Sequence, residues 1–261
     1  MTTQTKEPFI NKVALITGSG RGIGRSIAHE LAQQGADIII NYVRNQEPAE
    51  EIAKLIRDLG RKAIVVRANL AKIEDISRLF SQIESEFGKL DIFISNAASG
   101  FNHPGMEQKT SGWDWTMNVN ARAFLFATQK AVPLMEKCKN GKIISISSPG
   151  SHRVLPDYIA VGASKAALEA LTRYLAVELA PKNISVNCVS SGLVETDALR
   201  HFSTMSKDNV IERTIKNTPA GRLVQPEDIA KIVSFLCTTE ADMIRGQVIT
   251  VDGGFTLLVR E

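Results

Sequence analysis

The chain has 261 residues, of which 44% are hydrophobic and 23% are charged. This apolar content is close to the globular average and excludes a disordered or low-complexity chain. The 31 basic and 28 acidic residues leave a net charge of only +3, which indicates neither a nucleic-acid-binding nor a polybasic membrane-binding protein. No apolar run approaches the ~20 residues of a membrane span, and the polar N-terminus lacks a signal-peptide core.

The three cysteines, Cys138, Cys188 and Cys237, are widely spaced and form no CxxC pair. An odd number at this spacing predicts neither a disulfide framework nor a metal site. We therefore expect buried thiols in a reducing compartment, and a soluble cytoplasmic protein.

Short apolar runs alternate with longer patterns of helical period along the whole chain. Runs of nearly continuous apolar character, separated by helices, predict a parallel sheet covered on both faces, and no linker divides the chain. We expect one doubly wound α/β domain over residues 1–261. In chain order we expect a strand over Lys12–Thr17, a helix over Arg21–Gln34, a strand over Asp37–Tyr42, a helix over Glu47–Leu59, a strand over Ala63–Val66, a helix over Ile73–Phe87, a strand over Leu90–Ser95, a helix within Trp113–Lys137, a strand over Lys142–Ser147, a helix over Ala163–Ala180, a strand over Ile184–Val189, a helix over Pro226–Leu236 and a strand over Val248–Val251.

Two segments, Ala97–Gly112 and Gly192–Val224, are much longer than ordinary connections. Loops of this length tend to be functional, and both follow strands at the end where open α/β sheets bind ligands. An ordinary surface excursion is the alternative for the second segment, but its apolar residues favour a lid over an apolar substrate. These residues are Leu199, Phe202, Met205 and Ile211.

A glycine cluster stands between the first predicted strand and the first helix. Glycines allow a tight turn and close approach of the backbone to a pyrophosphate, and the helix N-terminus then supplies free N–H groups. The spacing is T-G-x-x-x-G-x-G, because Ile23 stands where the last glycine of G-x-G-x-x-G would fall. The predicted phosphate-binding residues are Gly18, Ser19, Gly20, Arg21, Gly22, Ile23 and Gly24.

The end of the second strand indicates which dinucleotide binds. An NAD site usually places an acidic residue there for the ribose 2′-hydroxyl, but the chain has no acid before Glu47. Arg44 and Arg21 can instead pair with a 2′-phosphate, which predicts NADPH. The alternative for Arg44 is a solvated loop charge.

Several separate motifs resemble those of the short-chain dehydrogenase/reductases, in the right order and over essentially the full length. The resemblance implies a Rossmann-like, seven-stranded parallel sheet in a three-layer α/β/α arrangement, hydride transfer from a nicotinamide, and a homotetramer. The matching residues are Thr17–Gly24, Ser95–Ala98, Asn120, Ser148, the Tyr158 and Lys165 pair, Gly192, Thr196 and Val251–Gly254.

One departure from the family pattern bears on the reaction. Ordinary members have Tyr-x-x-x-Lys, but the residue four before Lys165 is Val161, whereas Tyr158 lies seven before it. Seven residues are about 20° short of two helical turns, so both side chains can share a helix face. The spacing resembles the NADPH-dependent, type III (bacillus-like) enoyl-acyl-carrier-protein reductases, as do the strings at Asn96–Gly100, Trp113–Asn118, Ser164–Leu179 and Asn217–Arg222.

The resemblance also implies roles for the remaining site residues. Tyr158 would stabilise the substrate oxygen with Ser148 beside it, Lys165 would bind the ribose, and Asn120 would hold the water or backbone that orients Lys165. Ser148 also occupies the place of the catalytic serine of ordinary ketoreductases, so the site is a hybrid. The implied cofactor-binding residues beyond the glycine loop are Asn69 and Leu70 for the adenine, Asn96, Ala97 and Gly192, and Val194 and Thr196 for the carboxamide.

Three functions follow as hypotheses. The first is reduction of the trans-2 double bond of an enoyl thioester on acyl-carrier protein or coenzyme A. The second is reduction of a 3-oxoacyl thioester or another carbonyl, which suits Ser148 but not the tyrosine spacing. The third is an NADPH-binding sensor, for which a complete set of donor residues is unnecessary. The apolar tail Phe255–Val259 agrees with the implied homotetramer, and we expect no metal, nucleic-acid or membrane partner.

Overall fold

The seven predicted strands form one sheet in the computed structural model, which describes residues 7–195 and 210–258. The spatial order is β3-β2-β1-β4-β5-β6-β7, and every neighbouring pair is parallel. The strand order reverses between β1 and β4, so the predicted doubly wound, Rossmann-like α/β domain is confirmed. The strands are β1 (Val13–Ile16), β2 (Asp37–Tyr42), β3 (Ala63–Arg67), β4 (Ile92–Ser95), β5 (Gly141–Ser147), β6 (Ile184–Ser191) and β7 (Val248–Val251).

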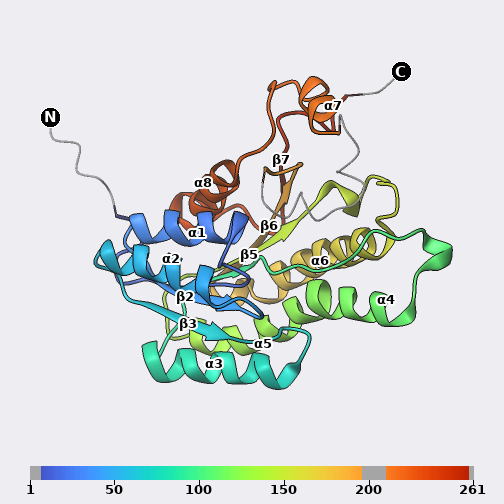
Figure 1. The fold of residues 1–261 in the computed structure, drawn as a ribbon. Helices are drawn as coiled ribbons and strands as arrows, with labels where there is room; N and C mark the ends of the chain where they lie inside the picture. The colour runs from blue at the N-terminus through green and yellow to red at the C-terminus, as the bar shows by residue number, and fades with distance from the viewer. Residues whose placement is uncertain (1–6, 196–209, 259–261) are drawn as a thin grey trace, which may run out of the picture.

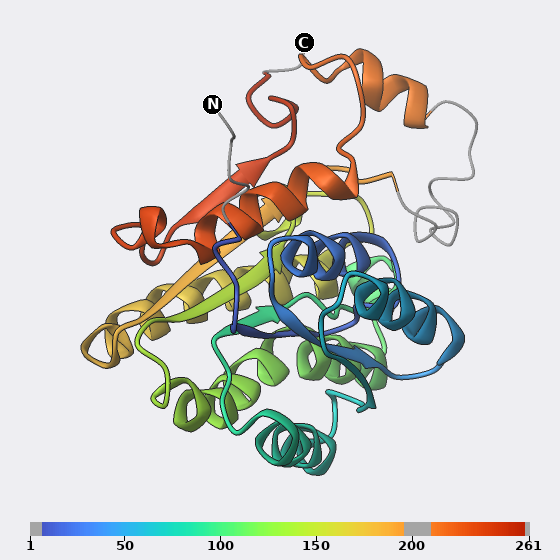
Figure 2. The same cartoon turned by 90° about the vertical axis from the view of Figure 1, so that its left-hand side faces the viewer.

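Helices cover both faces of the sheet, as Figures 1 and 2 show. Each face has its own hydrophobic core, and strand β2 contributes to both, because Ile38 and Ile40 point to one face and Ile39 to the other. One layer contains α1 (Gly22–Gln33), α2 (Glu47–Asp58) and α8 (Pro226–Cys237), and the other contains α3 (Ile73–Phe87), α5 (Ala123–Met135) and α6 (Ile159–Glu178).

The helix expected within Trp113–Lys137 is interrupted. It consists of α4 (Thr110–Met117), a π-helical turn η2 (Asn118–Arg122) and α5. A π turn accommodates an extra residue and changes the direction of nearby side chains, and such turns are frequent at functional sites. Periodicity of apolar residues does not reveal it, because both flanking helices keep the ordinary period.

Helix α6 begins at Ile159, four residues before the predicted start at Ala163. Gly162 lies in the first turn of this helix, although glycine weakens a helix interior. A Cβ atom at Gly162 would lie 2.7 Å from the carbonyl oxygen of Gly150, so close packing against that loop requires the glycine. Tyr158 is the N-cap residue, just outside the regular helix.

The predicted lid, residues 192–224, contains a further helix, α7 (Val210–Lys216). Its base is closed by a bridge between Val194 and Val224, and α7 lies beyond the sheet on the side of the C-terminus (Figure 1). Thr196, Leu199, Phe202 and Met205 lie outside the described residues. The lid function therefore stays a prediction.

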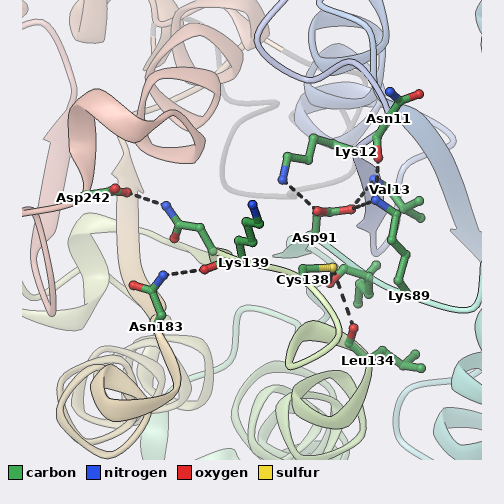
Figure 3. Close-up of polar contacts among 12 residues, drawn as sticks. Asn11, Lys12, Val13, Lys89, Asp91, Leu134, Cys138, Lys139, Asn183 and Asp242 are labelled. Atoms are coloured by element: carbon green, nitrogen blue, oxygen red, sulfur yellow. Dashed lines mark hydrogen bonds and ion pairs between the residues drawn. The ribbon is translucent and has the colours of Figure 1, made fainter.

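A cluster of charges occupies the opposite edge of the sheet, at the amino end of β4 (Figure 3). The carboxylate of Asp91 is 2.9 Å from the ammonium groups of both Lys12 and Lys89, and it accepts a hydrogen bond from the Val13 amide at 3.0 Å. Cys138 lies beside it with a thiol whose pKa burial raises to about 11.

No helix within residues 7–195 and 210–258 is long and apolar enough to cross a lipid bilayer.

Candidate active site

The glycine loop links β1 to α1 at the carboxyl edge of the sheet. Gly18 and Gly22 have φ values of 63° and 55°, which favour glycine. A Cβ atom at Gly24 would lie 2.5 Å from Nδ2 of Asn96, so α1 can approach the sheet only with a glycine there. Among the described residues, no side chain caps the first turn of α1, and its N–H groups therefore suit an anionic ligand such as a pyrophosphate.

Side chains from neighbouring strands fix the shape of this loop. Nδ2 of Asn96 donates hydrogen bonds to the carbonyl oxygens of Thr17 (2.8 Å) and Gly18 (3.1 Å), and the amides of Asn96 and Ala97 donate to Oγ1 of Thr17. Oδ1 of Asn41 accepts from the Gly18 amide at 3.2 Å. Asn41 was not among the predicted site residues, although an asparagine within the apolar run of β2 distinguishes this position in the sequence.

The predicted ribose and adenine contacts lie around the ends of β2 and β3. Arg44 and Arg21 are exposed, and neither forms an ion pair with another described residue, so both guanidinium groups can meet an anionic ligand. Asn69 and Leu70 follow β3, where Oδ1 of Asn69 accepts from the Ala71 amide and Leu70 is buried.

Further along the same edge of the sheet, Gly192 follows β6. A Cβ atom there would lie 2.9 Å from Cβ of Asp252, so the close packing against Asp252 requires a glycine. Val194 is buried at the bridge to Val224, which leaves its backbone as the part that can reach a ligand. Thr196 lies outside the described residues.

Ser148 and Tyr158 meet at the end of β5, with the serine Oγ 3.4 Å from the tyrosine Oη. The phenol ring lies on Gly150, where a Cβ atom would come within 2.6 Å of two ring carbons. Burial raises the pKa of Tyr158, and the hydrogen bond with Ser148 only partly opposes this. The phenol is therefore protonated at neutral pH and can donate a hydrogen bond to a substrate oxygen.

Val161 stands four residues before Lys165, where the dehydrogenase family that the sequence resembles ordinarily has its tyrosine. Its side chain is only 6% exposed, and its Cγ2 would be 2.3 Å from a Cβ atom at Gly100. The other two tyrosines of the chain lie elsewhere, because Tyr42 ends β2 and Tyr174 is 77% exposed on α6. Tyr158 is thus the phenol of this site.

Lys165 lies on α6, two helical turns beyond Tyr158, and its ammonium donates a hydrogen bond to the carbonyl oxygen of Ile146 at 2.7 Å. The residue is 5% exposed. Burial lowers the pKa of Lys165 to about 8, while the negative charge of the Glu169 side chain acts in the opposite direction. A buried ammonium of this kind can donate hydrogen bonds to the hydroxyl groups of a ribose, and its charge can be stabilised by a neighbouring carboxylate.

The π turn η2 carries Asn120 into the interior between α6 and the loop after β4. Its Oδ1 accepts from the Ser99 amide at 2.8 Å, and its Nδ2 donates to the Ser99 carbonyl at 2.9 Å and to Oγ of Ser164 at 2.8 Å. Asn120 thus connects the loop after β4 to the residue that precedes Lys165. Ser99 and Ser164 were missed, since small polar residues carry no distinctive sequence signal.

Comparison with known proteins identifies the family of this chain. A family model described as enoyl-(acyl carrier protein) reductase matches residues 18–256, and a short-chain type dehydrogenase/reductase of Picea abies is 37% identical over 93% of this chain and 92% of its own. The chain belongs to the short-chain dehydrogenase/reductase family. It is therefore an oxidoreductase.

Relatives of this short-chain dehydrogenase/reductase differ in the reactions that their names state. A hydroxynaphthalene reductase-like protein Arp2 from Metarhizium anisopliae is 35% identical over 96% of this chain and 97% of its own. A 1-cyclohexenylcarbonyl-CoA reductase from Streptomyces collinus is 34% identical over 95% and 88%.

Solved structures of similar dehydrogenases hold either nicotinamide dinucleotide. A 7α-hydroxysteroid dehydrogenase in complex with NADH and 7-oxo glycochenodeoxycholic acid has a TM-score of 0.90 at 32% identity, covering 97% of this chain and 98% of its own. A Burkholderia cenocepacia short-chain dehydrogenase in complex with NADP has a TM-score of 0.88 at 31% identity, covering 95% and 99%.

Proposed function

We propose that this enzyme reduces the trans-2 double bond of an enoyl thioester with NADPH, in the manner of the type III enoyl-acyl-carrier-protein reductases. The observation that carries the proposal is the position of the phenol. Tyr158 lies at the N-cap of α6 beside Ser148, while Val161 at the ordinary tyrosine position is buried against Gly100. The donor is thereby placed one helical turn further from Lys165 than in ordinary family members.

Each residue of the site has a part in such a reduction. Bound NADPH would supply the hydride that the β-carbon of the thioester accepts. The Tyr158 hydroxyl donates a hydrogen bond to the thioester oxygen, where negative charge develops as an enolate forms. Ser148 adds a second hydrogen bond there, and the α-carbon then takes a proton from Tyr158 or water. Lys165 would hold the ribose hydroxyls.

Arg44 and Arg21 support NADPH as the cofactor, because both guanidinium groups are exposed and lack ion-pair partners among the described residues. Replacing Arg44→Ala should weaken NADPH binding about tenfold or more, as expected for a charged hydrogen bond of about 1.5–3 kcal/mol, and leave NADH binding unchanged. Fluorescence titration of both cofactors measures this. Equal affinity of the unaltered enzyme for NADPH and NADH would contradict the assignment.

Reduction of a 3-oxoacyl thioester or another carbonyl is the second candidate. Ser148 lies where ketoreductases keep their serine, and the steroid dehydrogenase named above is complexed with an oxo compound. A cofactor sensor is less favoured, since binding alone does not need the Ser148 and Tyr158 pair.

The deciding experiment follows NADPH oxidation with paired crotonyl and acetoacetyl thioesters, each on coenzyme A and on acyl-carrier protein. We expect turnover of the enoyl thioester to exceed that of the 3-oxo thioester. The opposite preference selects carbonyl reduction, and binding of NADPH without turnover of any member of the panel selects the sensor. The two carriers in the assay also identify which thioester is the substrate.

We also propose that the enzyme is a cytoplasmic homotetramer. The three cysteines are free thiols, and the C-terminal segment exposes Leu257 and Leu258. Sedimentation velocity should give a tetramer at micromolar concentration, and a species that remains monomeric at all concentrations would contradict this assembly.

A further inference from the structure

A second ionisable side chain lies buried behind Lys165 on the same helix. Glu169 follows Lys165 by four residues, so the two side chains share one face of α6. Glu169 is 9% exposed and Lys165 is 5% exposed. A helix face packed on a sheet normally carries apolar residues, and a buried carboxylate is costly unless it is paired and hydrogen-bonded. The functions described above give Glu169 no role.

Three consecutive residues at the end of β5 each contact one ionisable side chain from α6 or its N-cap. The Ile146 carbonyl accepts from Lys165 at 2.7 Å, the Ser147 hydroxyl donates to Oε1 of Glu169 at 2.6 Å, and Ser148 Oγ lies 3.4 Å from the Tyr158 hydroxyl. Ser147 is itself 2% exposed. Glu169 thus contacts the same end of β5 as Lys165 and Tyr158 do.

We propose that Glu169 is a positioning residue, which acts through Lys165 and keeps its ammonium charged at neutral pH. The attraction between opposite charges is strong in an interior of low polarity. It opposes the tendency of a buried lysine to lose its proton. Ser147 contributes by fixing the carboxylate that provides this charge.

The other titratable groups near Lys165 do not supply a negative charge. Cys188 faces it from β6, and burial raises the pKa of that thiol to about 12, so the thiol is neutral where Lys165 titrates. Tyr158 has a raised pKa and is also neutral there. The remaining polar partner, Asn120 in η2, binds Ser164 and does not ionise. Glu169 is therefore the described anion that acts on Lys165.

The sign of the pH effect follows from this arrangement. Burial brings the pKa of Lys165 down to about 8 even with Glu169 present. Removing the carboxylate charge lowers that pKa further, so Lys165 becomes neutral closer to pH 7. Cofactor binding that depends on the ammonium must then weaken at a lower pH than in the unaltered enzyme, and recover in acid.

The test measures dissociation constants of NADPH and NADH, without acyl substrate, from about pH 5.5 to about pH 9.5. In the unaltered enzyme both affinities should decline above about pH 8. In Glu169→Gln the decline should begin about one pH unit lower, which corresponds to an about fivefold weaker affinity at pH 8, close to tenfold at about pH 9 and above, and near-normal affinity below pH 6. Since no acyl thioester is present, the outcome is separate from the choice between enoyl and carbonyl reduction.

Matched variants separate charge from packing. Glu169→Asp keeps the charge and should keep the decline within half a pH unit of the original. Thr172→Val removes a buried hydroxyl on the same helix, which hydrogen-bonds Ser145 of β5, without changing charge, and should not move the decline. If Glu169→Gln does not fold, Ser147→Ala should move the decline in the same direction by a smaller amount. The proposal is overturned if the decline does not move in the folded Glu169→Gln protein, or in Ser147→Ala if Glu169→Gln does not fold. It is also overturned if Thr172→Val shifts the decline equally.

Discussion

At the scale of single residues, the proposed reduction depends on the position of one tyrosine hydroxyl. The chain has three tyrosines, and the structure leaves Tyr158 as the one beside Ser148, two turns before Lys165 on α6. Its raised pKa keeps it protonated, and the lowered pKa of Lys165 places a titrating ammonium in the same site near neutral pH. An acid donor and a nearby cation of this kind are what stabilisation of a developing oxyanion requires.

The Tyr158 hydroxyl can be tested by removing it alone. Replacing Tyr158→Phe keeps the ring on Gly150 but removes the hydroxyl, so kcat for the enoyl thioester should fall about 10²–10³-fold, as for loss of one oxyanion donor. The NADPH dissociation constant should stay within about twofold, because the phenyl ring preserves the packing. Steady-state kinetics and fluorescence titration give the two values. Near-normal turnover would exclude Tyr158 as the donor.

At the scale of elements, short segments between strands and helices set the site geometry. The π turn η2 places Asn120 between the Ser99 backbone and Ser164, and the tight approach of η3 (Pro149–Ser151) to α6 places the Tyr158 ring. Glycines at positions 150 and 162 permit that approach. The orientation of the phenol is therefore a consequence of how closely one loop can pack on one helix end.

Substituting Gly150→Ala tests that packing. The new Cβ would come within 2.6 Å of the Tyr158 ring, so the ring must shift, and a misplacement of about 1 Å at a reacting group costs about 10²-fold in kcat. Circular dichroism should report an unchanged fold. Gly112→Ala is the matched control, because the only nearby atom is the flexible end of Gln108, and it should retain activity. Equal activity of both variants would show that the loop does not set the ring.

At the scale of the whole molecule, the carboxyl and amino ends of the strands gather different kinds of residues. The carboxyl edge gathers the glycine loop, Asn120, Ser148, Tyr158 and Lys165, while the amino edge carries the charge cluster around Asp91 (Figure 3). Burial by itself would raise the pKa of Asp91, but hydrogen bonds from Lys89, Lys12 and the Val13 amide outweigh it and hold that pKa below its ordinary value of 3.8. This cluster ties the start of β1 to the start of β4.

Replacing Asp91→Asn should therefore destabilise the protein at pH 7 by about 1–3 kcal/mol, a modest value because both lysines are partly solvated. The midpoint of thermal unfolding should fall by several degrees. A carboxylate with a lowered pKa stabilises above its unfolded pKa and loses this effect as the pH falls through the folded one. The difference from the unaltered enzyme should thus shrink below pH 4 in calorimetry. Asp114→Asn, at an exposed position, should change neither value.

The sequence by itself determined the order and type of most elements, because continuous apolar runs and helical periods are local properties. The seven strands, the glycine loop between β1 and α1, and the spacing of Tyr158 to Lys165 were all predictable.

Only the tertiary structure decided which of these residues meet. The strand order brings the ends of β1, β4, β5 and β6 together, and contacts such as Asn41 with Gly18, Asn120 with Ser164 and Ser147 with Glu169 join residues distant in sequence. The π turn and the early start of α6 were missed for the same reason. A glycine or a buried polar side chain is unfavourable locally, and it is tolerated where a partner from another element provides close packing or a hydrogen bond.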